Sequence, residues 1–265
     1  MTIDTAFGAR IVSLKHDGTE AISQLRWPES FGSTFWTSPQ SEWNWPPVQE
    51  FDKAAYEITE QSDSSLQLRG KVAERFGLRV EKRFVAKGNE KFLITYSIVN
   101  EGKEARRVAP WEITRVLNGG TVFFDAPTET LWTAGPNGER LASALTYEES
   151  EGAQWYESDE AQANRKMNAD AKGWLAWYDG KLLLVRHFTD LSDGQPAPGE
   201  AEVQVYVNRG KSYIELECQG AYVQLQPGER IDWCVEWQVA NGEDAEKAPQ
   251  GKRKWLMEKV KEMGN

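Results

Sequence analysis

Two glutamates near the end of the chain are the strongest candidates for acid–base chemistry. They lie in SYIELECQ at residues 212–219, where apolar and polar residues alternate as they do in a strand. The period of two places Tyr213, Glu215 and Glu217 on one face and directs the apolar set toward a core. Next-but-one residues of a strand lie roughly 6–7 Å apart, so the two carboxylates share one surface. Carboxylates held in this way can transfer protons to and from a bound molecule.

The segment that precedes them shows a similar polar face. In EVQVYVN at residues 202–208, Glu202, Gln204, Tyr206 and Asn208 alternate with three valines. Either of these strands alone is equally well explained as the solvated outer side of a sheet. Two such faces beside an aromatic loop favour a concave sheet that carries a ligand.

That aromatic loop is GSTFWTSPQSEWNWPP at residues 32–47. It has neither helical nor strand periodicity, and its prolines fix the backbone, so it is predicted to be a stiff loop. Such a loop either plugs a core or forms the wall of a ligand site. We expect Trp36 in the core, and we expect Trp43 and Trp45, with Gln40 beside them, to face a ligand.

Composition narrows the range of partners. A net charge of −10 and a pI near 5.0 argue against binding to nucleic acid or to an anionic membrane surface. No segment approaches the roughly 18 apolar residues that a membrane helix needs. The first ten residues lack the apolar region of a signal peptide, which fits a cytoplasmic protein and equally a periplasmic or secreted protein whose leader has been removed.

Histidine and cysteine are too scarce for most metal chemistry. The chain has only His16 and His187, so a histidine-based metal centre is not expected. Cys218 and Cys234 lie in strand-like segments and are expected to be free thiols. We therefore predict no metal and no cofactor.

The elements that position the candidate residues are almost all strands. Alternating or apolar runs, such as KFLITYSIVN at residues 91–100, are separated by turns rich in Gly, Asn and Asp. They recur roughly every 8–12 residues, as in stacked antiparallel sheets. No repeat, linker or change in composition divides the chain, so we expect one domain over residues 1–265.

Helical signals are few. Leu256, Val260 and Met263 follow Gly251 at helical spacing, which predicts a C-terminal helix that covers an edge or an end of a sheet. A weaker pattern over residues 158–171 leaves room for a second, short helix.

Three segments resemble the aldose 1-epimerase (galactose mutarotase-like) superfamily. GARIVSLKHDGTEAIS at residues 8–23 is similar to its opening, and residues 76–116 are similar to its central long strands. YIELECQGAYVQLQPGERIDWCVEWQV at residues 213–239 resembles its closing strands. The tryptophan-rich loop resembles an uncharacterised bacterial branch of it. The resemblance implies an all-β, antiparallel β-supersandwich with a sugar bound on a concave face. Together with the helix expected from spacing, the predicted fold is this supersandwich with a short C-terminal helix.

The resemblance also implies catalytic roles. In that superfamily a glutamate late in the chain takes the proton from the anomeric hydroxyl, and a mid-chain histidine protonates the ring oxygen. The glutamate matches Glu217 by motif position. Where the histidine is expected, this chain has APWEITRVLNGG at residues 109–120. Glu112 replaces it as acid if burial against Trp111 raises its pKa. Otherwise His187 takes the role, although its neighbours resemble a core strand.

The residues expected around the sugar come from several segments. Indole rings stack on the apolar face of a pyranose, and stiff prolines reduce the cost of holding them there. Arg75, at the start of a hairpin, either reaches inward from the rim or is a surface residue. We predict that Trp43, Trp45 and Glu217 line one pocket together with at least one of Arg75, Arg115 and Glu112. The full set of predicted substrate-binding residues is Gln40, Trp43, Trp45, Arg75, Trp111, Arg115 and Glu215.

Three functions remain open at this level, all with a small-molecule sugar or oligosaccharide as partner. The first is an epimerase-type isomerase with Glu217 as base and Glu112 as acid. The second is a carbohydrate-binding or accessory protein without catalysis, and the third is a glycoside hydrolase or lyase that uses a pair among Glu112, Glu215 and Glu217. A separation of about 5–9 Å between Glu112 and Glu217 in one cleft favours catalysis; otherwise binding is the better account.

Overall fold

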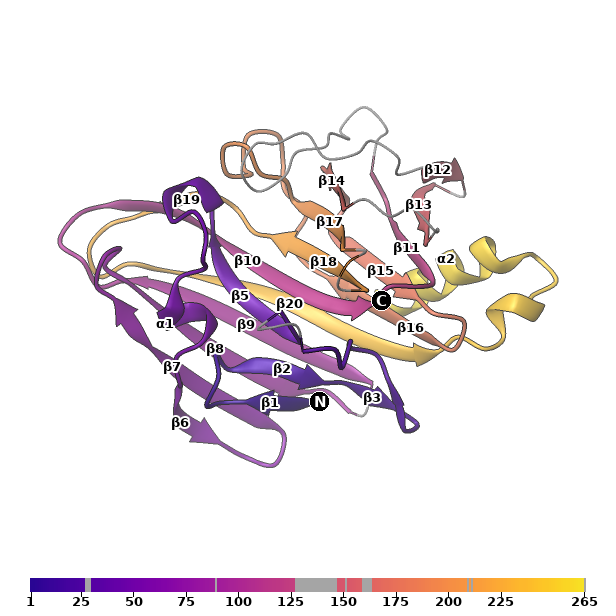
Figure 1. The fold of residues 1–265 in the computed structure, drawn as a ribbon, viewed down its shortest axis with the longest axis horizontal. Coiled ribbons are helices and arrows are strands. Elements are labelled where there is room, and N and C mark those ends of the chain that lie inside the picture. Colours follow the sequence, from indigo (N-terminus) through magenta and orange to yellow (C-terminus); the bar gives the residue numbers. More distant parts are fainter. Residues whose placement is uncertain are drawn as a thin grey trace.

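Two antiparallel sheets packed face to face make up most of the protein (Figure 1). The structure is a computed structural model, and it describes residues 1–26, 30–88, 90–126, 147–150, 152–158, 164–208, 210 and 212–264. The predicted all-β antiparallel sandwich is therefore confirmed. Its short connections follow from the frequent Gly, Asn and Asp turns that separate the strands.

Within the described ranges one sheet has eight strands and the other has ten. The eight-stranded sheet runs in the order β1 (Thr2–Asp4), β2 (Arg10–Ser13), β5 (Ser33–Ser38), β10 (Arg106–Leu117), β18 (Tyr213–Gln219), β17 (Val203–Asn208) and β14 (Arg165–Ala169), with β19 (Val223–Leu225) paired to β10. The ten-stranded sheet runs in the order β12 (Tyr147–Ser150), β13 (Ala153–Glu157), β11 (Thr121–Phe124), β15 (Trp174–Tyr178), β16 (Leu182–His187), β20 (Arg230–Asn241), β9 (Lys91–Asn100), β8 (Leu78–Ala86), β7 (Ser65–Ala73) and β6 (Glu57–Gln61). The smaller elements are the hairpin of β3 (Lys15–His16) and β4 (Thr19–Glu20), the helices α1 (Gln49–Asp52) and α2 (Lys252–Met263), and the 3₁₀ turns η1 (Gln40–Glu42) and η3 (Ala245–Lys247).

The main core fills the space between the two sheets. Alternation along β18 sends Ile214, Leu216 and Cys218 into it, as the sequence predicts, and these three side chains are fully buried. The other face of β18 is thereby turned away from the core, toward the loop that follows β5. This geometry determines where a ligand can reach the sheet.

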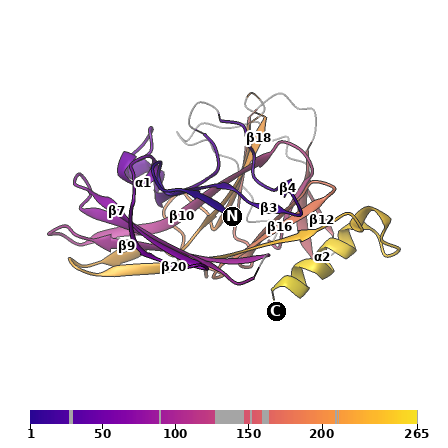
Figure 2. The same ribbon diagram turned by 90° about the horizontal axis from the view of Figure 1, so that it is seen from below.

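The C-terminal helix is confirmed and packs on the outer face of the ten-stranded sheet, at the end formed by β11, β13, β15 and β16 (Figure 2). Its apolar stripe buries Leu256, Met257 and Val260 in a second core against aromatic side chains such as Trp155. The weak helical pattern over residues 158–171 is not realised in the described part of that segment, because residues 165–169 form strand β14.

Candidate functional site

The outer face of the eight-stranded sheet collects polar side chains from three neighbouring strands. In the register of β18, Glu217 pairs with Gln204 of β17, and Glu215 pairs with Tyr206. On the other side of β18, the partner of Glu215 is Arg115 of β10. Side chains directly opposite on one face lie close enough to interact, so these rows form one continuous polar surface.

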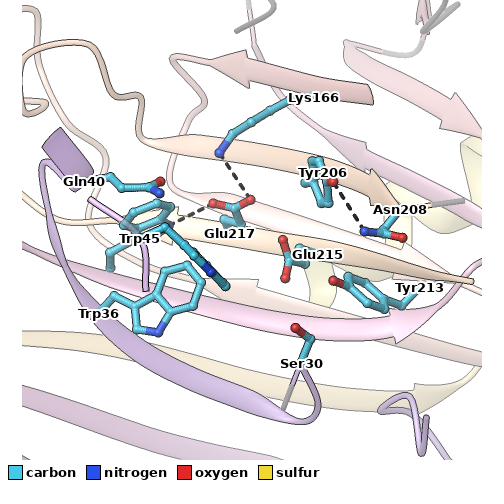
Figure 3. A pocket seen from close by; sticks show the side chains of 11 residues that line it. Ser30, Trp36, Gln40, Trp45, Lys166, Tyr206, Asn208, Tyr213, Glu215 and Glu217 are labelled. Carbon is cyan, nitrogen blue, oxygen red and sulfur yellow. Dashed lines mark hydrogen bonds and ion pairs between the residues drawn. The ribbon is translucent and has the colours of Figure 1, made fainter. Parts of the chain in front are cut away.

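A pocket of about 230 Å³ opens on this surface (Figure 3). Trp36 and Trp45 stand on one side of it, Tyr206, Asn208 and Tyr213 stand on the other, and Glu215 and Glu217 lie between them. Trp111 also lines the pocket, and we call the three tryptophans the indole wall. We call the whole cavity the Glu217 pocket. It is lined by Ser30, Trp36, Gln40, Trp45, Trp111, Lys166, Tyr206, Asn208, Tyr213, Glu215 and Glu217.

Glu217 is the most enclosed carboxylate of the pocket, with 2% of its surface exposed. The indole Nε1 of Trp111 donates a hydrogen bond of 3.0 Å to its Oε2, and Lys166 Nζ lies 3.5 Å from its Oε1. Burial raises the pKa of Glu217 to about 7; Lys166 and the Trp111 hydrogen bond oppose this rise, whereas Glu215 and Glu200 add to it. Near neutral pH this carboxyl group can therefore either give or take a proton.

Glu215 is neutralised from beneath the pocket. Arg115 donates to its Oε1 from Nε at 2.9 Å, and its second nitrogen NH2 lies 2.8 Å from the same oxygen. The Arg115 guanidinium is buried between the rings of Trp36 and Tyr213, at 6.0 and 5.8 Å from their centroids. Arg115 thus supports the pocket without lining it.

The indole wall is anchored by a carboxylate behind it. Trp36 Nε1 donates a 2.8 Å hydrogen bond to Oδ1 of Asp52, the last residue of α1. The same oxygen accepts from Thr34 at 2.8 Å and from Arg10 at 2.8 Å. Trp36 then meets Trp45 edge to face, with centroids 6.1 Å apart at 82°. Trp36 is buried in a cluster of aromatic side chains, as the sequence predicts, and it also forms an oriented wall of the pocket.

Trp43 is held away from the Glu217 pocket. It is buried, its Nε1 donates a 2.8 Å hydrogen bond to the backbone oxygen of Thr37, and it packs against Trp36 and Trp111. It does not line the Glu217 pocket, so the predicted place of Trp43 there is wrong. Trp45 does line the pocket, and 62% of its surface is exposed.

Gln40 reaches the pocket from the same loop, whose position is held by Glu200. The backbone nitrogen of Gln40 donates to Glu200 Oε1 at 2.9 Å, and Gln204 Nε2 donates to Glu200 Oε2 at 2.7 Å. A single carboxylate thereby connects the tryptophan-rich loop to strand β17.

Glu112 does not reach the pocket, and its predicted place there is wrong. Alternation along β10 turns Trp111 and Glu112 to opposite faces, and Glu112 enters the fully buried space between the sheets. There it binds Arg186 NH1 at 3.1 Å and accepts hydrogen bonds from Tyr96 at 2.7 Å and from Trp237 at 3.0 Å. Burial raises the pKa of Glu112, although these three partners oppose the rise. The group is part of the core.

Arg75 and Trp43 line a different pocket, which we call the Arg75 pocket. It has a volume of about 370 Å³ and is lined by Trp43, Trp45, Pro46, Pro47, Val48, Glu50, Ala73, Arg75 and Phe76. The prediction of one pocket shared by Trp43, Trp45, Glu217 and one of Arg75, Arg115 and Glu112 is therefore wrong. Trp45 and Glu217 do meet in one pocket, and Trp45 is common to both pockets.

His187 lies at the end of β16 in the ten-stranded sheet, close to Gly264 that follows α2. It is not among the residues of the Glu217 pocket.

Cys218 and Cys234 are free. In the part of the chain that the structure describes, no group of three or more His, Cys, Asp or Glu side chains is placed to hold a metal ion. No described helix has the length and apolar character of a membrane span.

Sequence reasoning missed several pocket residues. Tyr206, Asn208 and Tyr213 stand on the polar faces that alternation identifies in β17 and β18, so that signal was sufficient to propose them. Lys166 was not predicted as a pocket residue because its segment has a weak helical pattern. In the structure this segment is strand β14, along which Lys166 and Asn168 share one face. Ser30 lies on the Tyr213 side of the pocket (Figure 3), in a segment whose sequence has no distinguishing pattern.

Comparison with known proteins shows which known structures share the fold of this chain. The sequence profile of a family described as "Domain of unknown function (DUF4380)" matches residues 26–240. The structure is similar to a galactose mutarotase-like protein from Lactobacillus casei ATCC 334, with a TM-score of 0.64 and 11% identity, over 90% of this chain and 96% of that one. It is also similar to a galactose mutarotase-like protein from Clostridium acetobutylicum, with a TM-score of 0.59 and 9% identity, over 90% of this chain and 91% of that one. No functionally curated protein matches the sequence. At such low identities the likeness concerns the fold alone.

Proposed function

Because the chain belongs to the family described as a domain of unknown function (DUF4380) and has the galactose mutarotase-like fold, we propose that its Glu217 pocket binds one ring of a neutral sugar. The observation that carries this proposal is the indole wall, which lines the pocket beside two carboxylates. Indole faces suit the C–H face of a sugar ring, and carboxylates suit its hydroxyl groups.

The size and the charge of the Glu217 pocket support a neutral sugar ring as its ligand. A volume of about 230 Å³ lies below the roughly 300–1,000 Å³ of pockets that take drug-sized ligands. Glu215 is paired with Arg115, and Glu217 is close to Lys166, so neither carboxylate needs a cationic ligand for compensation. The neutral donors and acceptors of Tyr206, Asn208 and Tyr213 complete a lining that suits hydroxyl groups.

Calorimetric titration with a panel of monosaccharides tests the proposal. We expect at least one neutral aldose to bind the wild type, and we expect Glu217→Gln to weaken it by about 1 kcal/mol, the value of one hydrogen bond. Glu229→Gln, at an exposed position that lines neither pocket, is the matched control and should bind as the wild type does. If no aldose binds, the proposal fails.

A second candidate is interconversion of sugar anomers, and the pKa of Glu217 near 7 favours it. In this scheme the Glu217 carboxylate takes the proton of the anomeric hydroxyl while Lys166, 3.5 Å away, gives a proton to the ring oxygen. The bond between the anomeric carbon and the ring oxygen breaks, and an open-chain aldehyde forms. Rotation about the adjacent carbon–carbon bond and reversal of both transfers close the other anomer. Hydrolysis is less well supported, because the two carboxylates of the pocket come from one strand and approach a ligand from one side.

Polarimetry and exchange NMR separate the two candidates. A positioned acid–base group contributes about 10²–10⁴-fold to a rate, so Glu217→Gln should abolish interconversion while sugar binding stays within a few-fold. Binding without any enzyme-dependent interconversion in the wild type would assign the protein to the binding function.

A further inference from the structure

The Arg75 pocket borders the Glu217 pocket, and Trp45 forms a wall of both. The two pockets have volumes of about 230 and 370 Å³. Most of the Trp45 side chain is exposed even though it packs against Trp36. Trp45 is therefore the residue over which one extended ligand could contact both pockets.

The walls of the Arg75 pocket have the composition that a sugar ring requires. Trp43, Trp45 and Phe76 supply aromatic surface, and Pro46 and Pro47 keep the loop stiff. Phe76 also packs against the core, so its ring is held in place. Little ordering is needed when a ring settles between such walls.

Polar groups of both kinds reach the same space. The Arg75 guanidinium stacks 5.0 Å from the centroid of the Phe76 ring, and it forms no ion pair with any described residue. Glu50 of α1 lines the pocket as well and supplies a carboxylate. One donor group and one acceptor group of opposite charge suit hydroxyls, which both donate and accept, better than they suit an ionic ligand.

We propose that the Arg75 pocket is a second subsite, which takes the next ring of a neutral oligosaccharide whose first ring lies in the Glu217 pocket. This inference rests on the proposed sugar binding and deepens it from a single ring to a chain. Trp45 is then the contact shared by both rings. Arg75 determines the preference for the longer ligand.

Calorimetry with glucose and galactose, compared with maltose, cellobiose and lactose, tests the subsite. We expect at least one disaccharide to bind about tenfold more tightly than its component monosaccharides. Arg75→Ala should remove about tenfold of that disaccharide affinity, because a hydrogen bond to a charged group is lost, and should leave monosaccharide affinity unchanged. Trp45→Ala should weaken both ligand classes. Arg75 and Trp45 are exposed, so neither variant should impair folding.

Arg107→Ala is the matched control. Arg107 is also exposed and stacked on an aromatic ring, 4.4 Å from the centroid of Tyr222, but it lines neither pocket. Equal affinity for all five sugars, or an Arg75→Ala variant that binds the disaccharide as the control does, would overturn the subsite and leave single-ring binding intact. Failure of every sugar to bind would remove the proposed function and the subsite together.

Discussion

Lys166 Nζ lies 3.5 Å from Glu217 Oε1, and both side chains are more than nine-tenths buried on the outer face of the eight-stranded sheet. In such a site the interaction of two charges is much stronger than at the surface. The state of Glu217 near neutral pH is therefore set by burial, which favours the acid, and by Lys166, which favours the carboxylate.

Removing Lys166 should raise the pKa of Glu217 further. In Lys166→Met the positive charge that lowers this pKa is gone, so we expect a value above the present one of about 7. NMR titration of ¹³C-labelled glutamate carboxyls, with Glu217→Gln used for assignment, measures it. Lys181→Met, in an exposed turn, is the control and should leave the titration unchanged. A Glu217 pKa that is the same in wild type and Lys166→Met would contradict the assigned pairing.

Stability should fall with rising pH because of Glu217. Its pKa is about 7 in the folded state, against 4.5 for an unperturbed glutamate, so the folded state binds the proton more tightly than the unfolded chain does. The resulting stabilisation is complete below about pH 4.5 and is lost as pH rises to about 7. Urea denaturation at several pH values should therefore give a wild-type advantage over Glu217→Gln that shrinks across this window. Glu202, whose pKa burial raises to about 8, is present in both proteins and cancels in the comparison. A constant difference would be evidence against the elevated pKa.

Replacing Glu112 should lower the stability of the protein and have little effect on its affinity for a sugar. Arg186 NH1 also donates to Thr114 Oγ1 and to the backbone oxygen of Leu216, both at 3.0 Å, so the guanidinium cannot leave the core. Glu112→Gln leaves that charge without its counter-ion, which typically costs about 3–5 kcal/mol. Chemical denaturation measures the loss. At a temperature where the variant is folded, sugar affinity should equal that of the wild type; a large drop would indicate that Glu112 acts on the pocket.

Alternation was a reliable guide where one face of a strand is polar and the other apolar. It placed Glu215 and Glu217 away from the core, and they do line the pocket. The same rule applied to β10 separates Glu112 from Trp111, but a carboxylate was not expected in the core. Its counter-ion, Arg186, is 74 residues away in the chain and belongs to the other sheet, so no local pattern indicates that the charge is compensated.

The tryptophan-rich loop was predictable only in part. A loop has no period, so the sequence identifies a rigid aromatic segment but not which indole is buried. Asp52, which lies beyond the loop in α1, holds Trp36 toward the pocket, and a backbone oxygen of β5 holds Trp43 in the core. Both contacts exist only after the chain has folded around β5 and α1.

Substitution of Trp43 should therefore destabilise the protein much more than substitution of Trp45. Trp43→Ala removes a buried indole and its hydrogen bond to Thr37, and a buried aromatic replaced by alanine typically costs about 3–5 kcal/mol. Trp45→Ala removes an indole that is 62% exposed, so we expect a loss of about 0.5 kcal/mol, as for surface positions.

Urea denaturation of the two variants under one set of conditions measures this difference. Their changes are chemically identical and only two residues apart, so each variant is the control for the other. Trp45→Ala should have a midpoint only slightly below that of the wild type while it loses sugar affinity, because its indole lines both pockets and is mostly exposed. Equal midpoints for the two variants would contradict the burial of Trp43 in the core.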